Sequence, residues 1–404
     1  MTGIGIASPN GLGAEAYWAA TLRGETGIGR ITRFDPSGYP AVLAGEVPPF
    51  EPSDYLPGRL IPQTDQVTRL SLMATDWALK DAGVDLSDFP DDNIGVVTAN
   101  SSGGFEYSQR ELEKLWGPGD QNVSAYLSFA WFYAVNTGQI SIKNNLRGPS
   151  GVLVTGQAGG LDAAAQARRY IRDGVALMVT GGMDSAICPW GWVAQLTDPH
   201  LSLVDDPARA YLPFDQAAAG YVPGEGGAML IVEGATAARQ RNARPYGEIL
   251  GYGTTFDPRP GSGREPGLKR AIDEAMRDAG ANVADIDVVF ADAAGVGRLD
   301  RIEAAAIGAV FGPRGVPVTA PKTMTGRLYA GSSALDLATA LLSIRHGVIP
   351  PTINVAKPVV DDDLDLVLGA PRPAALRTAL VIARGTGGFN SAIVVSDRGR
   401  GRFD

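Results

Sequence analysis

The 404-residue chain is predicted to be an α/β protein made of two halves with similar structure. Short apolar segments with the length of buried strands alternate with longer helical segments, which is typical of α/β folds with parallel strands. The order strand, Gly-containing loop, strand, loop and helix occurs twice, and each copy ends in Arg-x-Gly, at 172–174 and 345–347. We therefore expect a duplicated α/β unit whose halves, residues 1–240 and 241–404, share one hydrophobic core.

The first half begins with a predicted strand at residues 3–9 and has a second strand at 93–98, which runs into a Ser/Gly loop. Residues 151–156 are predicted to form a short buried strand, followed by a turn of small residues and a helix at 161–172. The N-terminus of such a helix favours negative charge, on a thiolate or on an oxyanion. This strand, turn and helix therefore form a frame that can activate a side chain.

The second half repeats the pattern, with predicted strands at 247–252, 287–292 and 316–319 and a long helix from about Ser332 to the Gly at 347. Towards the end of the first half, a segment rich in Pro and Gly leads into a strand at 228–232. Its carboxylates, Asp215 and Glu225, are interpreted as acceptors of backbone N–H bonds that hold a structural loop, in preference to a catalytic pair.

Composition limits the classes of function. The content of 45% hydrophobic and 20% charged residues is ordinary for a soluble protein, and a net charge of -9 argues against a nucleic-acid partner. The short Arg/Gly tail at 398–402 is interpreted as disordered. A single Cys excludes intramolecular disulfides and fits a reducing cytosol, and no apolar run is long enough to cross a membrane. We expect a cytoplasmic protein without a membrane partner, and we identify no metal site.

Gln157 lies in the turn before the first central helix, where a Cys or Ser would be interpreted as an acyl-carrying nucleophile. The Gln amide is neutral, does not ionise and forms no thioester. The chain therefore has the frame of a covalent catalyst without its reactive atom.

Short motifs are spread along essentially the whole chain: Ser8-Pro9, Pro213-Phe-Asp215 with Gly224-Glu225-Gly226, Lys322 with Thr325-Gly326, and Gly387 to Ala392. Together they resemble the motifs of β-ketoacyl synthases of the thiolase-like superfamily. Four further segments are 154–162 (VTGQAGGLD), 128–136, 183–185 and 189–191. With these segments the resemblance is closest to the chain-length factor, or ketosynthase β subunit, of bacterial type II aromatic polyketide synthases. It implies a thiolase-like fold with five layers in the order αβαβα.

The resemblance also implies where catalytic groups should stand. An active ketosynthase would have a Cys nucleophile and two His residues, and the matching positions here are Gln157, Ala294 and Arg327. Of the polar residues that the family has in these motifs, only the Lys is present in this chain, as Lys322.

The remaining reactive side chains lie outside these motifs. His200 and His346 are interpreted as surface or helix-end residues, and Cys188 as a buried small hydrophobic residue.

The resemblance implies a subunit without condensation activity of its own. It would pair with an active ketosynthase α subunit, and the polyketide would grow from the partner's Cys into a tunnel along the interface. The substrate would be carried on the phosphopantetheine of an acyl carrier protein, with no cofactor bound directly to this chain. Because the chain is acidic, nothing in its sequence marks a carrier-protein site, and we expect docking mostly on the α subunit.

Residues 105–116 are predicted to form an amphipathic helix with Phe105, Ser108 and Leu112 on one face and charged residues, Glu111 among them, on other faces. The pattern alone favours packing into the subunit's own core. The resemblance instead matches these three positions to the family's chain-length gate. Further candidates to line the tunnel are Trp192 and Trp190, although the default interpretation of both is packing in the core. Because two gate residues are small or aliphatic, we expect a longer polyketide than an all-aromatic gate would allow.

Three alternatives stay open. The first is a decarboxylase that makes an acetyl primer from malonyl-carrier protein. It ranks lower because Ala294 has no donor for the enolate oxygen, and losing one donor slows such steps roughly 100- to 1000-fold. The second is an active homodimer that uses Thr155 or Ser185 as its nucleophile, and the third is a scaffold without a tunnel.

Two further expectations concern the ends and edges of the chain. The aromatic segment 124–136 is expected at the dimer seam, where aromatic residues concentrate. The start at Met1 is abrupt beside the family's first strand, so we expect a few native residues to precede it.

Overall fold

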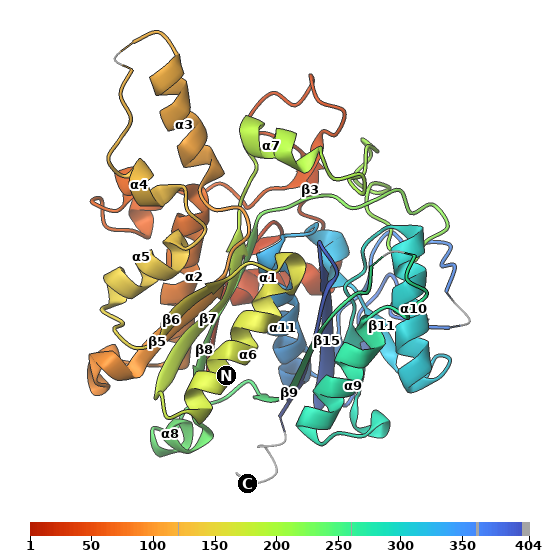
Figure 1. The fold of residues 1–404 in the computed structure, drawn as a ribbon. Helices are drawn as coiled ribbons and strands as arrows, with labels where there is room; N and C mark the ends of the chain where they lie inside the picture. Colours follow the sequence, from red (N-terminus) through yellow and green to blue (C-terminus); the bar gives the residue numbers. More distant parts are fainter. Residues whose placement is uncertain (120, 260, 361–362, 398–404) are drawn as a thin grey trace.

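The computed structural model describes residues 1–119, 121–259, 261–360 and 363–397, and the Arg/Gly tail at 398–402 lies outside these described residues. The chain folds into two six-stranded sheets with helices between them and on both outer faces (Figure 1). This arrangement has the five predicted layers, in the order αβαβα.

The first sheet is formed by residues 3–233 and has the strand order β2-β1-β8-β7-β5-β6. Its strands are β1 (Gly3–Ser8), β2 (Gly11–Leu12), β5 (Ile94–Ala99), β6 (Ser150–Leu153), β7 (Leu177–Asp184) and β8 (Gly226–Glu233). Strand β5 pairs in parallel with β6 and β7, while β8 runs antiparallel to β7 and β1.

The second sheet is formed by residues 248–396 and has the order β13-β11-β10-β15-β16-β9. Its strands are β9 (Glu248–Phe256), β10 (Val288–Phe290), β11 (Pro317–Thr319), β13 (Asp365–Leu366), β15 (Thr378–Gly385) and β16 (Phe389–Ser396). Strand β10 pairs in parallel with β11 and β15, while β16 runs antiparallel to β15 and β9. The equivalent central strands of the two sheets thus have the same order and direction, which confirms the predicted duplication.

The predicted parallel arrangement is wrong for part of each sheet, because both sheets are mixed. In the second sheet, β15 and β16 are joined by the short segment 386–388, which can only connect neighbouring antiparallel strands. Gly387 and Gly388 have φ of +91° and +92°, a left-handed backbone that favours glycine. The glycine pair was the sequence signal for this hairpin.

The central layer contains α6 (Gly159–Arg172) and α11 (Ala330–His346), which lie between the two sheets. Every residue from Ala330 to Ile344 is buried, as expected for a helix covered on both sides. A Cβ at Gly160 would lie 2.4 Å from the backbone N of Ala334, so only glycine permits this helix contact. One hydrophobic cluster contains Ile4, Leu161 and Val381, which confirms that the two halves share a core.

The outer layers cover the remaining faces of the sheets. Helices α2 (Gln66–Ala82) and α5 (Val135–Asn144) pack on the first sheet, and α9 (Leu268–Ala279) and α10 (Gly297–Phe311) pack on the second. The other helices are α1 (Ala14–Arg23), α3 (Phe105–Trp116), α4 (Leu127–Ala130), α7 (Pro189–Gln195) and α8 (Ala235–Gln240). Two small sheets pair β3 (Ile28–Arg30) with β4 (Leu43–Gly45) and β12 (Val348–Ile349) with β14 (Arg372–Pro373).

Helix α3 projects from the layered core, with α4 and α7 as its neighbours (Figure 1). In the described part of the chain, no helix is both long enough and apolar enough to span a membrane.

A buried carboxylate ties the two halves together beside the turn that carries Gln157. Asp162, in the first turn of α6, accepts a hydrogen bond from Thr155 Oγ1 at 2.6 Å. Its other oxygen accepts from the Tyr252 hydroxyl of the second half at 2.7 Å and from Ser391 Oγ. Asp162 therefore fixes the start of α6 against the second sheet.

We predict that Asp162→Ala lowers the free energy of unfolding by about 3 kcal/mol or more, because it leaves three hydroxyl donors without their charged acceptor. Urea denaturation followed by circular dichroism measures this change. The control is Asp173→Ala at the end of the same helix, where the side chain is exposed and the expected change is below about 0.5 kcal/mol. Equal losses in the two variants would contradict the role given to Asp162.

Candidate active site and gate helix

An open cleft of about 730 Å³ lies where the turn before α6, the loop after β10 and the β15–β16 turn meet. Gln157, Ala294 and Arg327 all line it, so the fold brings the three positions singled out in the sequence to one place. Lys322 does not belong to the cleft lining.

Gln157 lies in a 3-10 turn, Gly156–Ala158, directly before α6. Its side chain is buried apart from the part that faces the cleft, and Gly156 packs against residues 385–386 with φ of +56°. Strand β6, which leads into this turn, is half-buried, so the prediction of a fully buried strand is wrong. The reason is that β6 is the edge strand of its sheet, a position that the local sequence does not reveal.

The loop that carries Ala294 is held by buried carboxylates. Glu303 accepts hydrogen bonds from the backbone N–H groups of Asp292 at 2.6 Å and Ala293 at 2.9 Å, and Asp300 accepts from Gly295 at 3.1 Å. Burial raises the pKa of Glu303 to about 8. The loop is thus rigidly placed, yet its cleft-facing Ala294 has only a methyl group, which can neither donate a hydrogen bond nor transfer a proton.

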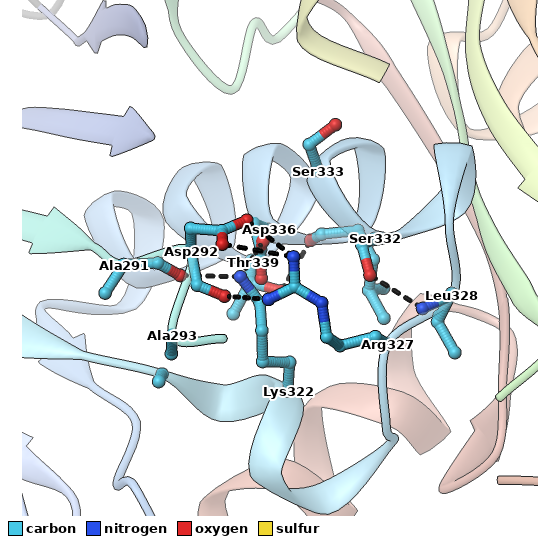
Figure 2. A network of polar contacts seen from close by, with 12 residues as sticks. Ala291, Asp292, Ala293, Lys322, Arg327, Leu328, Ser332, Ser333, Asp336 and Thr339 are labelled. Atoms are coloured by element: carbon cyan, nitrogen blue, oxygen red, sulfur yellow. Dashed lines mark hydrogen bonds and ion pairs between the residues drawn. The ribbon is translucent and has the colours of Figure 1, made fainter. Parts of the chain in front are cut away.

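Arg327 is locked into a buried ion pair (Figure 2). Its Nη2 donates to both carboxylate oxygens of Asp292, at 3.0 and 3.1 Å, and its Nη1 donates to the Asp292 carbonyl at 2.8 Å. Burial opposes the guanidinium charge, but the adjacent Asp292 carboxylate more than compensates and holds the pKa of Arg327 above its usual value. A permanently charged guanidinium cannot exchange protons as a His does.

Lys322 forms the second buried ion pair of this network (Figure 2). Its Nζ lies 2.6 Å from Asp336 Oδ2 on α11 and donates to the Ala291 carbonyl at 2.5 Å. Lys322 therefore links the turn after β11 to the central helix and to the end of β10.

The alternative nucleophiles are engaged elsewhere. Thr155 donates its hydroxyl to Asp162, and Ser185 donates to Glu225 at 2.5 Å. Cys188 is buried, as predicted, and burial raises the pKa of its thiol to about 12, so little thiolate forms near neutral pH.

One imidazole that the sequence interpretation placed on the surface lines the cleft. His200 Nδ1 lies 3.1 Å from Asp198 Oδ1, and the same carboxylate accepts the Tyr221 hydroxyl at 2.9 Å. No sequence motif marked this residue, because the loop before the Pro/Gly-rich segment has no periodicity. His346 lies in the last turn of α11, as expected.

The Pro/Gly-rich loop before β8 is structural, as predicted. Asp215 accepts backbone N–H bonds from Ala217, Ala356 and Lys357 at 2.7–2.8 Å. Glu225 accepts from the Val47 backbone at 2.9 Å.

The predicted amphipathic helix is α3, but its apolar stripe does not pack into the subunit's core. Phe105 and Leu112 are half-buried and lie outside the core clusters of the described residues, while Ser108 is buried and donates to the Gly104 carbonyl. Glu111, which was placed on another face, is buried and accepts the Ser124 N–H at 2.6 Å. The packing of α3 depends on α4 and α7, which the local pattern does not include.

The two tryptophans on α7 have different environments. Trp192 is fully buried in a cluster with residues of β3 and β4, and its indole N–H donates to the Ala41 carbonyl at 3.0 Å. It is a core residue, so the prediction that it lines the tunnel is corrected. Trp190 is 43% exposed and meets the ring of Phe105 edge-on, with ring centroids 5.0 Å apart.

Aromatic side chains of segment 124–136 form an exposed surface. Tyr126, Trp131, Phe132 and Tyr133 are each 37–51% exposed, although large aromatic residues are usually covered. The described ranges contain no group of three or more His, Cys, Asp or Glu side chains placed to hold an ion.

Comparisons with known proteins agree with this geometry. The family model of the β-ketoacyl synthase N-terminal domain matches residues 1–238, and that of the C-terminal domain matches residues 246–356. The tetracenomycin polyketide synthase ketoacyl synthase beta subunit of Streptomyces glaucescens is 58% identical over 401 residues, which cover 99% of this chain and 98% of that protein. The 3-oxoacyl-[acyl-carrier-protein] synthase 2 of Coxiella burnetii is 32% identical over 98% of this chain and 97% of its own length.

Among solved structures, the ishigamide ketosynthase/chain length factor has a TM-score of 0.89 at 28% identity and covers 98% of both chains. The much higher identity to a beta subunit than to a 3-oxoacyl synthase also places the sequence within the family. The chain belongs to the β-ketoacyl synthase family, in the branch of the ketosynthase β subunits, or chain length factors, of type II polyketide synthases.

Proposed function

We propose that this chain is the non-condensing β subunit of a ketosynthase heterodimer and sets the length of the poly-β-ketone made by its α partner. The observation that carries the proposal is the single cleft lined by Gln157, Ala294 and Arg327, none of which can serve as a nucleophile or exchange a proton as a His does. The growing chain would be attached to the partner's Cys. Its extender units would arrive on the phosphopantetheine of an acyl carrier protein, and no cofactor would be bound by this chain.

The chemistry of condensation explains why three replacements matter together. A thioester intermediate needs a thiol or hydroxyl, and the extender needs donors at the oxygen where enolate charge develops. Gln157 supplies no nucleophile and Ala294 supplies no donor. The Nη1 and Nη2 groups of Arg327 are already directed at Asp292. Because these groups of Arg327 already bind Asp292, they do not act as donors to an enolate oxygen, and the primer-forming decarboxylase therefore ranks below the chain-length function.

An exposed edge supports the pairing. Strand β6 ends the first sheet, and no strand of the described residues lies on its outer side. Ile142 and Val154 nearby are exposed by 74% and 44%. Unpaired strand edges and exposed aromatic residues are common where another chain binds. Together with the aromatic residues of segment 124–136, this edge would suit an α subunit of the same fold.

The gate would lie on α3. Phe105, Ser108 and Leu112 share one face of this helix, and Phe105 is backed by Trp190. We propose Trp190, in place of Trp192, as the fourth residue of the gate.

We predict that Gln157→Cys restores no condensation. In a heterodimer whose α-subunit Cys is replaced by Ala, the new thiol would still lack a proton-transferring partner, because Ala294 and Arg327 remain. Incorporation of labelled malonyl-carrier protein into polyketide measures this, and a product above background would contradict it.

With an unaltered α subunit, Gln157→Ala is expected to keep the condensation rate within about threefold, since ΔΔG‡ below about 0.7 kcal/mol indicates no direct role.

We predict that Leu112→Phe shortens the polyketide by at least one ketide unit, because the larger ring occupies space at the gate. Mass spectrometry of the products of the paired α and β subunits measures chain length. The control is Glu113→Phe, which adds the same ring on the exposed side of α3 and should leave the lengths unchanged. Unchanged product lengths with Leu112→Phe would contradict the assignment of the gate to α3.

We predict that Lys322→Met costs about 3–5 kcal/mol of unfolding free energy, because it leaves Asp336 buried without its cation. The double variant Lys322→Met, Asp336→Leu should recover most of this loss, since it removes both charges. Thermal and urea denaturation of the two variants measure the difference. A stable single variant would show that Lys322 was kept for another reason than the ion pair.

A further inference from the structure

A side chain of α3 holds the first turn of α7, its neighbour at the top of the view in Figure 1. Gln109, in the middle of α3, accepts the backbone N–H of Trp190 on its side-chain Oε1 at 2.8 Å. The two residues are 81 positions apart in the sequence, so only the fold brings them together.

This bond gives α7 a hydrogen-bond acceptor that the helix lacks. The first N–H groups of a helix have no carbonyl partner within it. In α7, Pro189 has no N–H, and the N-cap Cys188 accepts the Gly191 N–H on its sulfur at 3.4 Å, a long bond to a weak acceptor. The amide oxygen of Gln109 is a stronger acceptor, and it lies at 2.8 Å from the Trp190 nitrogen. Gln109 therefore caps α7 from another helix.

The carboxamide of Gln109 is oriented for this bond. Its Nε2 donates to Glu113 Oε1, one turn further along α3, at 2.7 Å. A carboxylate only accepts hydrogen bonds, so the amide nitrogen faces Glu113 and the amide oxygen faces Trp190. The bond to Trp190 does not require Glu113, because only the oxygen of the amide can accept a backbone N–H.

Trp190 is contacted by α3 at two points. Phe105 and Gln109 are four residues apart, so they lie on the same face of the helix. Phe105 meets the indole ring edge-on, with ring centroids 5.0 Å apart and planes at 83°, while Gln109 holds the backbone of the same residue. Because Trp190 is 43% exposed, packing covers only part of it. These two contacts therefore fix its place relative to α3.

The opposite side of α7 is anchored in the body of the subunit. Trp192 is fully buried, and its indole N–H donates to the Ala41 carbonyl at 3.0 Å. Helix α7 is thus a fixed support, and Gln109 links the projecting helix α3 to it.

We propose that Gln109 is a positioning residue that narrows the range of polyketide lengths by fixing the width of the gate, an inference that rests on the proposed function. The proposed gate lies between the stripe of α3 and Trp190, so its width is set by the separation of α3 and α7 at this point. The hydrogen bond of Gln109 holds that separation. Without it, the two helices move apart more easily, and the gate admits a wider range of chain lengths.

This role differs from that of the gate residues themselves. Leu112 would act through its volume, so a larger side chain there shifts the product to a shorter length. Gln109 would act through Trp190, so the loss of its hydrogen bond broadens the distribution of lengths without a change in the volume of the gate stripe.

The test uses Gln109→Met in the paired α and β subunits, because Met keeps the length of the side chain and removes the acceptor. Mass spectrometry of the products is expected to show about a fivefold rise in the ratio of minor lengths to the dominant length, the population change that the loss of one hydrogen bond produces. The double variant Gln109→Glu, Glu113→Gln keeps an acceptor for Trp190 and a donor beside it, so it should give the distribution of the unaltered protein. The matched control is Gln240→Met, at an exposed glutamine at the end of α8, which should leave the distribution unchanged.

A second measurement does not depend on polyketide synthesis. Hydrogen–deuterium exchange of the full chain, resolved at the Trp190 amide by mass spectrometry, should be about fivefold faster in Gln109→Met, because this N–H loses its acceptor. The double variant should exchange at the rate of the unaltered chain.

An unchanged length distribution in Gln109→Met, alongside a shorter product from Leu112→Phe, would overturn the proposal and leave the proposed function in place. Unchanged exchange at Trp190 would overturn it whatever the products are. A broadening that the double variant does not reverse would assign the effect to a general loosening of α3 and would also overturn it. If neither Gln109→Met nor Leu112→Phe alters the products, the proposed gate is wrong, and the role of Gln109 is wrong with it.

Discussion

The contact between α6 and α11 is the constraint on which the rest of the structure depends. The two helices fill the space between the sheets, and the backbone at Gly160 approaches Ala334 so closely that no side chain fits between them. Each helix follows a parallel strand of its own half, so both N-termini point to the same region. Gln157 lies just before α6 and Arg327 just before α11. The cleft is thus a consequence of how the central layer packs.

Within this frame, a network of two buried ion pairs lies beside the cleft. Asp292 satisfies Arg327, and Asp336 satisfies Lys322, in surroundings where an unpaired charge would cost several kcal/mol. A buried His can gain or lose a proton near neutral pH, whereas the Arg327 guanidinium, whose pKa is held above its usual value by Asp292, keeps its charge. The network fixes the loop beyond β10 and the start of α11, which are also the elements that surround the cleft.

The fold was largely predictable because its signals are local and repeated. Apolar strands, the Gly-containing turns and the closing Arg-x-Gly sequences predicted the duplicated unit. The antiparallel hairpin of β15 and β16 was not predicted, although Gly387 and Gly388 favour it. The missed features depend on neighbours distant in sequence. Strand β6 is half-buried because it lies at a sheet edge, and Trp192 is buried because β3 and β4 cover it. The His200 side chain is 40% exposed, as a surface residue would be, but the fold also brings it to the cleft that Gln157 lines.

The sequence by itself determined which chemical groups are available: an amide, a methyl group and a guanidinium at three positions of a catalytic frame. These identities are sufficient to exclude a covalent nucleophile there, because reactivity at a single atom depends on the residue type. The tertiary structure decided how those groups are used and what surrounds them. It paired Arg327 with Asp292, left the stripe of α3 half-exposed beside Trp190, and joined Gln109 to the backbone of α7. Pairing, exposure and contacts between helices depend on distances between segments far apart in the chain, and only folding sets those distances.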